Sequence, residues 1–259
     1  MGFMKSSSFK IATWNTKQGV APRKKEPELW KWIQETIAPD LIVLTEAKPP
    51  KAGFPKDWYG VWVPGGVGNR RPFGTVIAGQ SVELRNTEFR RRRTKSLEDR
   101  PNSATTFSVD VSRDGEFLLR VLGHYGLMLG DKNGLDALKV LSNEVEDILH
   151  EHGDKRFVLA GDFNLWPDYV VGVFEGFGLT SVTDLRDSFP TLRDPMYGSR
   201  IWTHKNGPKS SNGRCQELDF IFISKELRDQ IIGTNGGIDD FPDAWEMSDH
   251  APVTADLAI

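Results

Sequence analysis

The chain has 259 residues, a length that fits one large domain or two small ones. Hydrophobic residues make up 38% and charged residues 27%, so the composition is that of a soluble globular protein able to bury a core. The formal net charge of -3 excludes a protein that binds nucleic acid through its bulk charge, and any polyanion site must be a local patch.

The sequence also limits the compartment and the domain organisation. Cys215 is the only cysteine, which excludes an intramolecular disulfide and fits a reducing compartment. Met1–Lys10 lacks the apolar run of a signal peptide, and no stretch approaches the ~18 apolar residues of a membrane span. We therefore expect a cytoplasmic protein with a flexible N-terminus over residues 1–8. Residues 9–259 are predicted to form a single domain, because no loop is long enough for a convincing linker.

Short apolar runs rich in β-branched and aromatic residues alternate with turn residues and predict strands. In chain order these are Phe9–Trp14, Leu41–Thr45, Gly74–Ala78, Ala104–Val111, Phe117–Gly123, Phe157–Ala160, Leu218–Ile223 and Ala251–Leu257. Apolar residues at helical spacing predict helices over Glu26–Ile37 and Asn133–His150. Strands outnumber helices and short turns often separate them, which favours a mixed or antiparallel sheet in an α/β fold.

Polar side chains gather where the predicted strands begin or end. The first set follows the C-terminal ends of strands and comprises Asn15, Glu46, His124, Asp162 and, two residues farther on, Asn164. The second set opens or precedes strands and comprises Asp219, Asp249 and His250. Strands that run in opposite directions can bring both sets to one edge of the molecule, which an all-parallel sheet could not do as simply.

The residue types suit the hydrolysis of a phosphate ester. A hard cation such as Mg²⁺ prefers oxygen ligands, and Glu46 is the natural main ligand, with Asn15 and Asp249 beside it. Asp162 and Asn164 could hold and deprotonate an attacking water.

His250, oriented by the carboxylate of Asp219, could neutralise charge on a phosphoryl oxygen or donate a proton. Phosphoryl transfer needs mainly positioning and charge stabilisation, which these groups supply.

The ordered motifs resemble the endonuclease/exonuclease/phosphatase superfamily, which includes pancreatic-type deoxyribonucleases, AP endonucleases, deadenylases, sphingomyelinases and inositol-phosphate 5-phosphatases. The motifs are "TWN" at Asn15, "LTE" at Glu46, "LGH" at His124, "GDFN" at Gly161–Asn164, "LDFIFIS" at Leu218–Ser224 and "SDH" at Ser248–His250. They follow the family's order over nearly the full chain. "GDFN" after an apolar strand is far more specific than "SDH" alone.

The resemblance implies a four-layer α/β sandwich of two packed mixed β-sheets flanked by helices, with Mg²⁺ as cofactor and Mn²⁺ able to substitute. It implies Glu46 as metal ligand supported by Asn15 and Asp249, Asp162 and Asn164 as nucleophile and phosphate positioners, Asp219–His250 as a dyad, and His124 as a phosphate or leaving-group contact. Some members carry Tyr at the His124 position, so this chain is sorted toward the His-bearing branches. Many members carry Arg where this chain has Glu217, which puts a phosphate contact from that position in doubt.

Each residue also has a structural interpretation when it is taken alone. Asn15 could cap a turn, Glu46 could be a solvated loop carboxylate and His124 a satisfied structural histidine. The "GDFN" segment could be a plain turn, and Asp249–His250 could cap an element. All these interpretations would have to hold at once to remove the site, so we prefer the catalytic interpretation.

Other residues bear on the substrate. Arg90, Arg91, Arg92 and Arg93 form the main basic run, which is either a solvated face or a contact to a phosphate backbone. Trp166, just past "GDFN", either stacks on a base or lipid or merely packs. The remaining histidines, His150, His152 and His204, have the character of surface or loop residues and receive no role.

Three functions follow from these observations. The first is a metal-dependent nuclease that cuts a DNA or RNA phosphodiester by in-line attack of water, with nucleic acid as substrate and no obligate protein partner. The alternative is a phosphatase or phosphodiesterase acting on a lipid or sugar phosphate, suggested by the acidic balance and Glu217. A non-catalytic binding module on the same fold ranks last, because no expected site residue is replaced.

Overall fold

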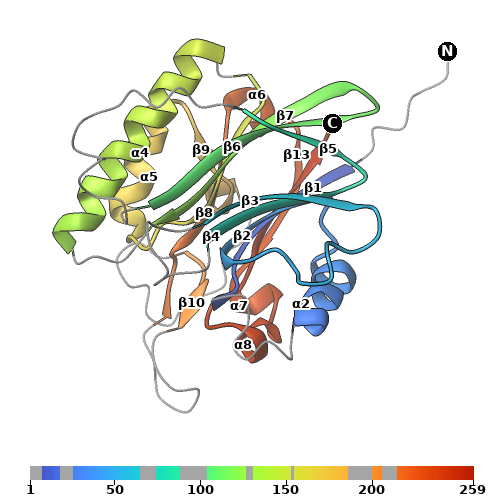
Figure 1. Ribbon diagram of the computed structural model, residues 1–259. Coiled ribbons are helices and arrows are strands. Elements are labelled where there is room, and N and C mark those ends of the chain that lie inside the picture. The colour runs from blue at the N-terminus through green and yellow to red at the C-terminus, as the bar shows by residue number, and fades with distance from the viewer. Residues whose placement is uncertain are drawn as a thin grey trace.

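Two six-stranded sheets form the centre of the computed structural model. The structure describes residues 8–17, 26–64, 74–87, 104–126, 131–152, 155–185, 200–205 and 215–259. The sheets pack against each other, with helices on the outer face of each (Figure 1). This arrangement confirms the predicted α/β sandwich of two mixed sheets flanked by helices.

The first sheet has the strand order β13-β14-β1-β2-β4-β3. Its strands are β1 (Ser8–Asn15), β2 (Leu41–Ala47), β3 (Trp58–Pro64), β4 (Gly74–Gln80), β13 (Ile231–Gly236) and β14 (Val253–Ala258). Within this sheet β1 and β2 run parallel, and every other neighbouring pair runs antiparallel. The central strand β1 therefore has the chain's last strand on one side and β2 on the other.

The second sheet has the order β5-β6-β7-β8-β12-β9. Its strands are β5 (Glu83–Asn86), β6 (Ala104–Arg113), β7 (Glu116–Gly126), β8 (Phe157–Asp162), β9 (Thr180–Ser181) and β12 (Asp219–Ile223). Here β7 and β8 are parallel and the other neighbours are antiparallel. A small ribbon of β10 (His204–Lys205) and β11 (Cys215–Gln216) stands apart from both sheets.

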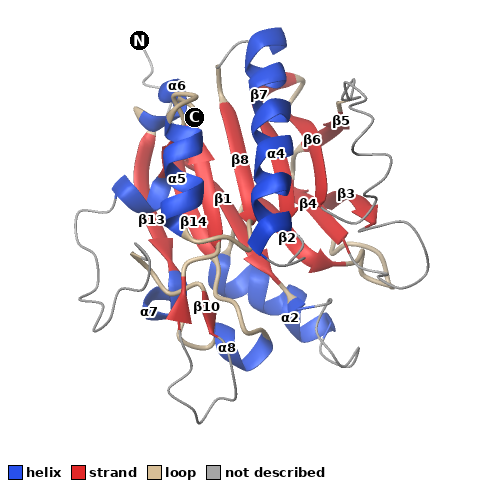
Figure 2. Ribbon diagram, turned by 90° about the vertical axis from the view of Figure 1, so that its left-hand side faces the viewer, coloured by secondary structure: helices blue, strands red, loops and turns tan. Residues whose placement is uncertain are grey.

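Helices cover the outer faces. The first sheet is covered by α2 (Glu26–Trp32) and its π-helical extension (Ile33–Ile37), and α8 (Ala244–Met247) adds to the same apolar cluster. The second sheet is covered by α4 (Asp131–His152) and α5 (Pro167–Glu175), which lie in front of it in Figure 2. Short turns complete the fold: a 3₁₀ turn (Val182–Leu185), α6 (Lys225–Arg228) and α7 (Gly237–Asp240).

Strand alternation divides the core into layers. On β1, Ile11 faces the second sheet, whereas Ala12 and Trp14 face the helical layer, where the Trp14 ring lies 5.0 Å from that of Trp32. Because strands in the middle of each sheet are buried on both faces, their runs are apolar almost throughout, which is why the sequence marked them as strands.

The predicted elements agree closely with the structure. Each predicted strand is present with ends shifted by a few residues, and both predicted helices are present. The segment predicted as one helix over Glu26–Ile37 changes from α-helical to π-helical at Ile33 and ends at Ala38, whose φ is 48°. Residues 1–7 of the predicted flexible N-terminus lie outside the described residues, and Ser8 already opens β1. Among the described helices, none has the length and apolar character needed to cross a membrane.

Candidate active site

The strand directions bring the predicted polar residues toward one edge of the sandwich. The parallel strands β1 and β2 carry Asn15 and Glu46 at their C-terminal ends. In the second sheet, Asp162 at the end of β8 pairs directly with Asp219 at the start of antiparallel β12. The segment before β14 joins them, because the Trp14 indole donates to the His250 carbonyl at 2.8 Å. One edge thus collects residues from both ends of the chain.

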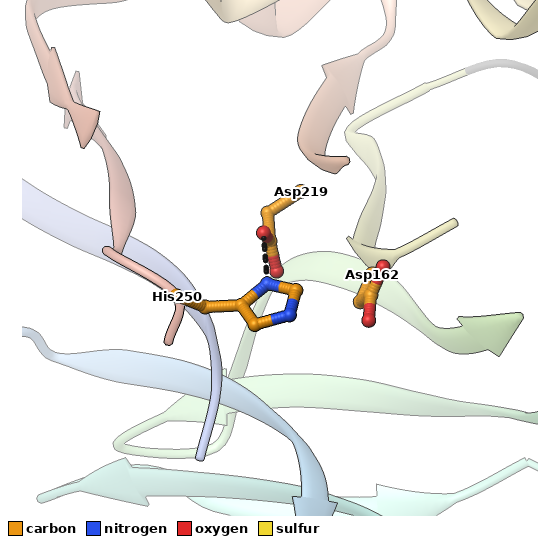
Figure 3. A group of neighbouring side chains, drawn as sticks. All are labelled: Asp162, Asp219 and His250. Atoms are coloured by element: carbon orange, nitrogen blue, oxygen red, sulfur yellow. Dashed lines mark hydrogen bonds and ion pairs between the residues drawn. The ribbon is translucent and has the colours of Figure 1, made fainter. Parts of the chain in front are cut away.

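His250 and Asp219 form the predicted dyad. His250 Nδ1 donates to Asp219 Oδ2 at 2.7 Å, and both side chains are buried (Figure 3). Burial by itself would lower the pKa of His250, but the charge and hydrogen bond of Asp219, together with the charge of Asp162, raise that pKa to about 9. The imidazole is therefore a cation at neutral pH and can stabilise an anionic oxygen.

Asp162 lies against the same imidazole and is held by a dense set of hydrogen bonds. Asn15 Nδ2 donates to Asp162 Oδ2 at 2.7 Å. The Asn164 backbone N–H donates to Asp162 Oδ1 at 2.8 Å, and its side-chain amide donates to Oδ2 at 3.0 Å. Burial and the charge of Asp219 raise the pKa of Asp162 above its ordinary value, in opposition to His250 and these donors. A carboxylate with a raised pKa is suited to accept a proton from a water.

The "GDFN" turn has a clear local cause. Gly161 has φ +151°, and a Cβ atom there would overlap the carbonyl oxygen of His124 on the neighbouring strand. Asn164 has φ 52°, a conformation that asparagine tolerates better than most residues. The glycine thus lets β8 approach β7 closely, and the turn then aims Asp162 and Asn164 at the site.

Oxygen atoms suited to a hard cation lie at the ends of β1 and β2 and before β14. Glu46 Oε1 accepts from the Tyr125 hydroxyl at 2.8 Å, and Asp249 Oδ2 accepts from Lys17 Nζ at 2.8 Å. Asn15 Oδ1 accepts from the Lys17 backbone N–H at 2.8 Å. These ligand atoms are carboxylate and amide oxygens, which fits the preference of Mg²⁺; Glu46 and Asp249 are partly exposed, whereas Asn15 is buried.

A second group of potential ligands is Asp162, Asp219 and His250, whose ligand atoms all lie within 4.8 Å of one another; no other such group of His, Cys, Asp or Glu occurs in the described part of the chain. This group suits a proton relay better than a metal. The Nδ1 atom of His250 is already bound to Asp219 Oδ2 at 2.7 Å, so it is not free to bind an ion.

The structure corrects the interpretation of His124. Register pairs Tyr125, not His124, with Asp162, so Tyr125 shares the face of Asp162 and reaches Glu46. His124 points to the opposite face, where its ring packs 5.0 Å from Phe163 and its Nδ1 lies 2.8 Å from the Thr106 hydroxyl. Burial lowers the pKa of His124 to about 3, so it is a neutral core residue rather than a phosphate contact.

The sequence interpretation also missed His204. Its ring centroid lies 4.4 Å from that of His250, and its Nδ1 is 2.9 Å from Gln216 Oε1. His204 and His250 form an isolated antiparallel bridge, so β10 runs alongside the "SDH" motif. No local sequence pattern predicts this contact, because the two histidines are far apart in the sequence and do not share a turn or a helix.

Glu217 is held in the protein interior by hydrogen bonds. Its side chain is buried and accepts hydrogen bonds from the Thr183 hydroxyl at 3.0 Å and the Arg200 backbone N–H at 2.7 Å. Burial raises the pKa of Glu217 to about 7 against the effect of these donors. The Thr203 hydroxyl accepts from the backbone N–H of Asp219 at 3.1 Å, and this bond helps to fix the start of β12, which carries Asp219.

The structure says less about the residues for which we considered a substrate contact. Trp166 is partly buried and precedes α5, where its carbonyl accepts from the Tyr169 N–H at 3.0 Å. The arginine run Arg90–Arg93 lies outside the described residues.

Comparison with known proteins agrees with this geometry. The sequence profile of the Endonuclease/Exonuclease/phosphatase family matches residues 12–250. No curated protein sequence matches the chain.

Solved structures are similar over nearly their whole length. The 3'-5' exonuclease NExo from Neisseria meningitidis is 21% identical, with 96% of this chain and 99% of that chain covered at a TM-score of 0.65. An AP endonuclease from Archaeoglobus fulgidus is 19% identical, with 97% and 100% covered at 0.65. The AP endonuclease LMAP from Leishmania major is 15% identical, with 98% and 89% covered at 0.68. At these identities the likeness shows a shared fold.

Proposed function

This chain belongs to the endonuclease/exonuclease/phosphatase family, and on that premise we propose that it is a divalent-metal-dependent phosphodiesterase that cuts nucleic acid. The observation that carries the proposal is the buried group of Asp162, Asp219 and His250, in which a carboxylate with a raised pKa faces a protonated imidazole. A neighbouring base and cation can serve the in-line attack of water on a phosphodiester, because one can accept the proton of the water and the other can stabilise a phosphoryl oxygen.

The roles follow from the contacts. Asp162 is positioned by Asn15 and Asn164 to orient a water and accept its proton. His250, oriented by Asp219, stabilises charge on a phosphoryl oxygen.

A metal fits the neighbouring oxygens. Glu46, Asn15 and Asp249 would hold the ion, which when bound supplies a Lewis acid for the phosphate. We propose Mg²⁺, with Mn²⁺ able to replace it, because these oxygen donors suit a hard cation. Tyr125 takes the place we had given to His124 and orients Glu46 through its hydroxyl.

Nucleic acid is the favoured substrate class. Among the similar structures, NExo from Neisseria is described as a 3' phosphatase bound to product DNA hairpin, and others are AP endonucleases. The basic run Arg90–Arg93 and the aromatic Trp166 would supply backbone contacts and a stacking surface.

A lipid or sugar phosphate is the second candidate. The net charge of -3 and the burial of Glu217, where many family members carry Arg, favour a substrate less anionic than a polynucleotide.

An assay panel decides between these functions. Purified protein is incubated with supercoiled DNA, single-stranded RNA, a phosphoinositide and sphingomyelin, each with Mg²⁺, Mn²⁺ or EDTA. We expect metal-dependent cleavage of DNA or RNA that the Asp162→Asn variant lacks. Cleavage confined to a lipid substrate would overturn the nucleic-acid assignment. Cleavage unaffected by EDTA would overturn metal dependence, and wild-type protein inactive on all four substrates with either metal would favour the non-catalytic module.

A further inference from the structure

One residue, Lys17, engages much of the candidate metal centre. Its ammonium Nζ lies 2.8 Å from Asp249 Oδ2, and its backbone N–H donates to Asn15 Oδ1 at 2.8 Å. The remaining oxygen ligand, Glu46, has a different partner in the Tyr125 hydroxyl. Lys17 therefore binds two of the oxygen-bearing side chains that we assign to the metal.

The backbone holds Lys17 in this position. Lys17 follows the end of β1 and has φ 49°, a conformation uncommon for a residue with a side chain. The Asn15 side chain accepts from the N–H two residues on, a local turn that stabilises this conformation. The end of β1 is in turn fixed to the "SDH" segment, because the Ser248 hydroxyl donates to the Asn15 carbonyl at 2.8 Å. Lys17 and Asp249 are thus brought together by the fold and not only by mutual attraction.

The charge of Lys17 acts on Asp249. Burial would raise the pKa of Asp249, but the hydrogen bond and charge of Lys17 and the charge of His250 outweigh it, and the pKa lies below its ordinary value. The Lys17 side chain is 57% exposed and that of Asp249 31%, so solvent ions can reach the pair. A divalent ion that binds Asp249 must share this carboxylate with the Lys17 ammonium or displace the ammonium. The ion and the ammonium are both positively charged, so they repel each other when they are bound to the same carboxylate.

We propose that Lys17 is a built-in counter-ion that competes with the divalent metal for Asp249 and so weakens metal binding. The inference rests on the proposed function, because it assumes that Asp249 belongs to the metal site. An exposed ion pair generally contributes little to folding stability. If the Lys17–Asp249 pair had only that structural role, its removal would leave the affinity for the metal unchanged. Competition instead requires metal affinity to rise when the ammonium is lost.

The test is Mn²⁺ binding measured by calorimetry at constant ionic strength, on the full chain without substrate. Lys17→Gln removes the ammonium and keeps the backbone N–H bond to Asn15; Lys17→Arg keeps the charge. The matched control is Lys10→Gln, which removes an ammonium 3.8 Å from Asp256 at the opposite end of β1. Glu46→Gln provides the reference for loss of a ligand, and thermal unfolding confirms that each variant is folded.

We expect Lys17→Gln to bind Mn²⁺ roughly three- to ten-fold more tightly than the wild type, as for one unit charge removed near a divalent ion. Lys17→Arg and Lys10→Gln should match the wild type, and Glu46→Gln should bind more weakly. Equal affinity in Lys17→Gln and wild type, or the same tightening in Lys10→Gln, overturns the inference and leaves the proposed function standing. A wild type that binds no Mn²⁺ overturns the proposed metal centre, and the inference with it.

Discussion

The Asp219–His250 pair illustrates how burial makes two residues depend on each other. Asp219 is fully buried, and its charge is tolerable because His250 Nδ1 donates to it at 2.7 Å. The imidazole in turn owes its raised pKa and its orientation to Asp219. If the pair is catalytic as we propose, the effects of changing the two side chains should therefore be coupled in kinetics.

We expect His250→Ala and Asp219→Asn each to lower kcat by roughly 10²–10⁴-fold, because one removes the cation and the other misorients it. The double variant should be little worse than the poorer single variant, since the pair acts as a unit. Steady-state kinetics on the four proteins at saturating metal measures this. Losses that simply multiply in the double variant would show that the two side chains act independently.

A further residue-scale prediction separates His124 from catalysis. Burial depresses the pKa of His124 from 6.5 to about 3 in the folded state, so the unfolded chain binds a proton at higher pH than the folded one. Above pH ~6.5 the burial of neutral His124 does not reduce the free energy of unfolding. As the pH falls from there toward 3, the free energy of unfolding decreases. At pH 5 the loss is about 2 kcal/mol, at roughly 1.4 kcal/mol per pH unit.

His124→Gln should remove this acid-sensitive loss and keep turnover. Urea unfolding of both proteins at pH 7.5 and pH 5 measures it: the wild type should lose about 2 kcal/mol more than the variant on acidification. A large fall in kcat for His124→Gln in a folded protein would restore His124 to the site. An equal loss of stability in both proteins would mean that His124 titrates normally.

At the scale of elements, the sequence predicted the inner strands of both sheets, because burial on both faces makes them apolar, but it missed the edge strands β3, β9 and β13. An apolar run such as Phe157–Ala160 has no second interpretation when Gly161 and Asp162 follow it. The ordered motifs likewise singled out Asp162, Asn164, Asp219 and His250, and hydrogen bonds join Asn164 to Asp162 and His250 to Asp219. Helix α5 was not predicted, although Pro167 begins it and its apolar residues pack on the second sheet.

The residues that the sequence did not predict are those placed by pairing across the fold. Tyr125 and His124 are neighbours, and only the register of β7 against β8 decides which of them faces Asp162. His204 contacts His250 through a β-bridge between separate segments. Lys17 forms an ion pair with Asp249, although the two residues lie near opposite ends of the sequence. A one-residue error in register reverses the face of a side chain, and short motifs do not determine that register.

The close approach of β7 and β8 yields a prediction at this scale. Gly161→Ala should destabilise the protein by about 3 kcal/mol or more, because the added methyl group would overlap the His124 carbonyl and the backbone has φ +151°. Gly172→Ala in α5 is the matched control, since a Cβ there meets nothing within 4 Å. The control should gain roughly 0.5–1 kcal/mol from helix propensity. Urea unfolding of both variants distinguishes these outcomes, and a fully stable Gly161→Ala would contradict the strand geometry.

Over the whole molecule, the two sheets place their functional ends on the same edge. Strands β1, β2 and β8 end there and β12 begins there, while α6 follows the other end of β12. Figure 1 shows α6 at the side of the molecule opposite α7 and α8. One edge carries the candidate site residues and the other carries α6, so the effect of removing charge at α6 provides a reference.

This contrast tests the role of the arginine run. The net charge of -3 gives no bulk attraction for a polynucleotide, so any steep salt dependence of binding must come from a local patch. If Arg90–Arg93 contact a backbone, replacing Arg91 and Arg92 with Ala should weaken DNA or RNA binding. The dependence of log Kd on log salt should flatten by about one unit per lost phosphate contact. Fluorescence anisotropy over a salt series, with the catalytically inactive Asp162→Asn background, provides the measurement.

The matched control removes two charges from the far edge, Lys225→Ala with Arg228→Ala on α6, where both side chains are exposed. It should leave the affinity and the salt slope at wild-type values, because α6 lies at the edge away from Asp162 and the start of β12. Cleavage of a small bis-aryl phosphate should be unchanged in both double variants made in the active protein, since that substrate engages only the reacting centre. Wild-type affinity and slope in the Arg91/Arg92 variant would remove the arginine run from the substrate path. That result would move the substrate toward a lipid or sugar phosphate while leaving Asp162, Asp219 and His250 in their roles.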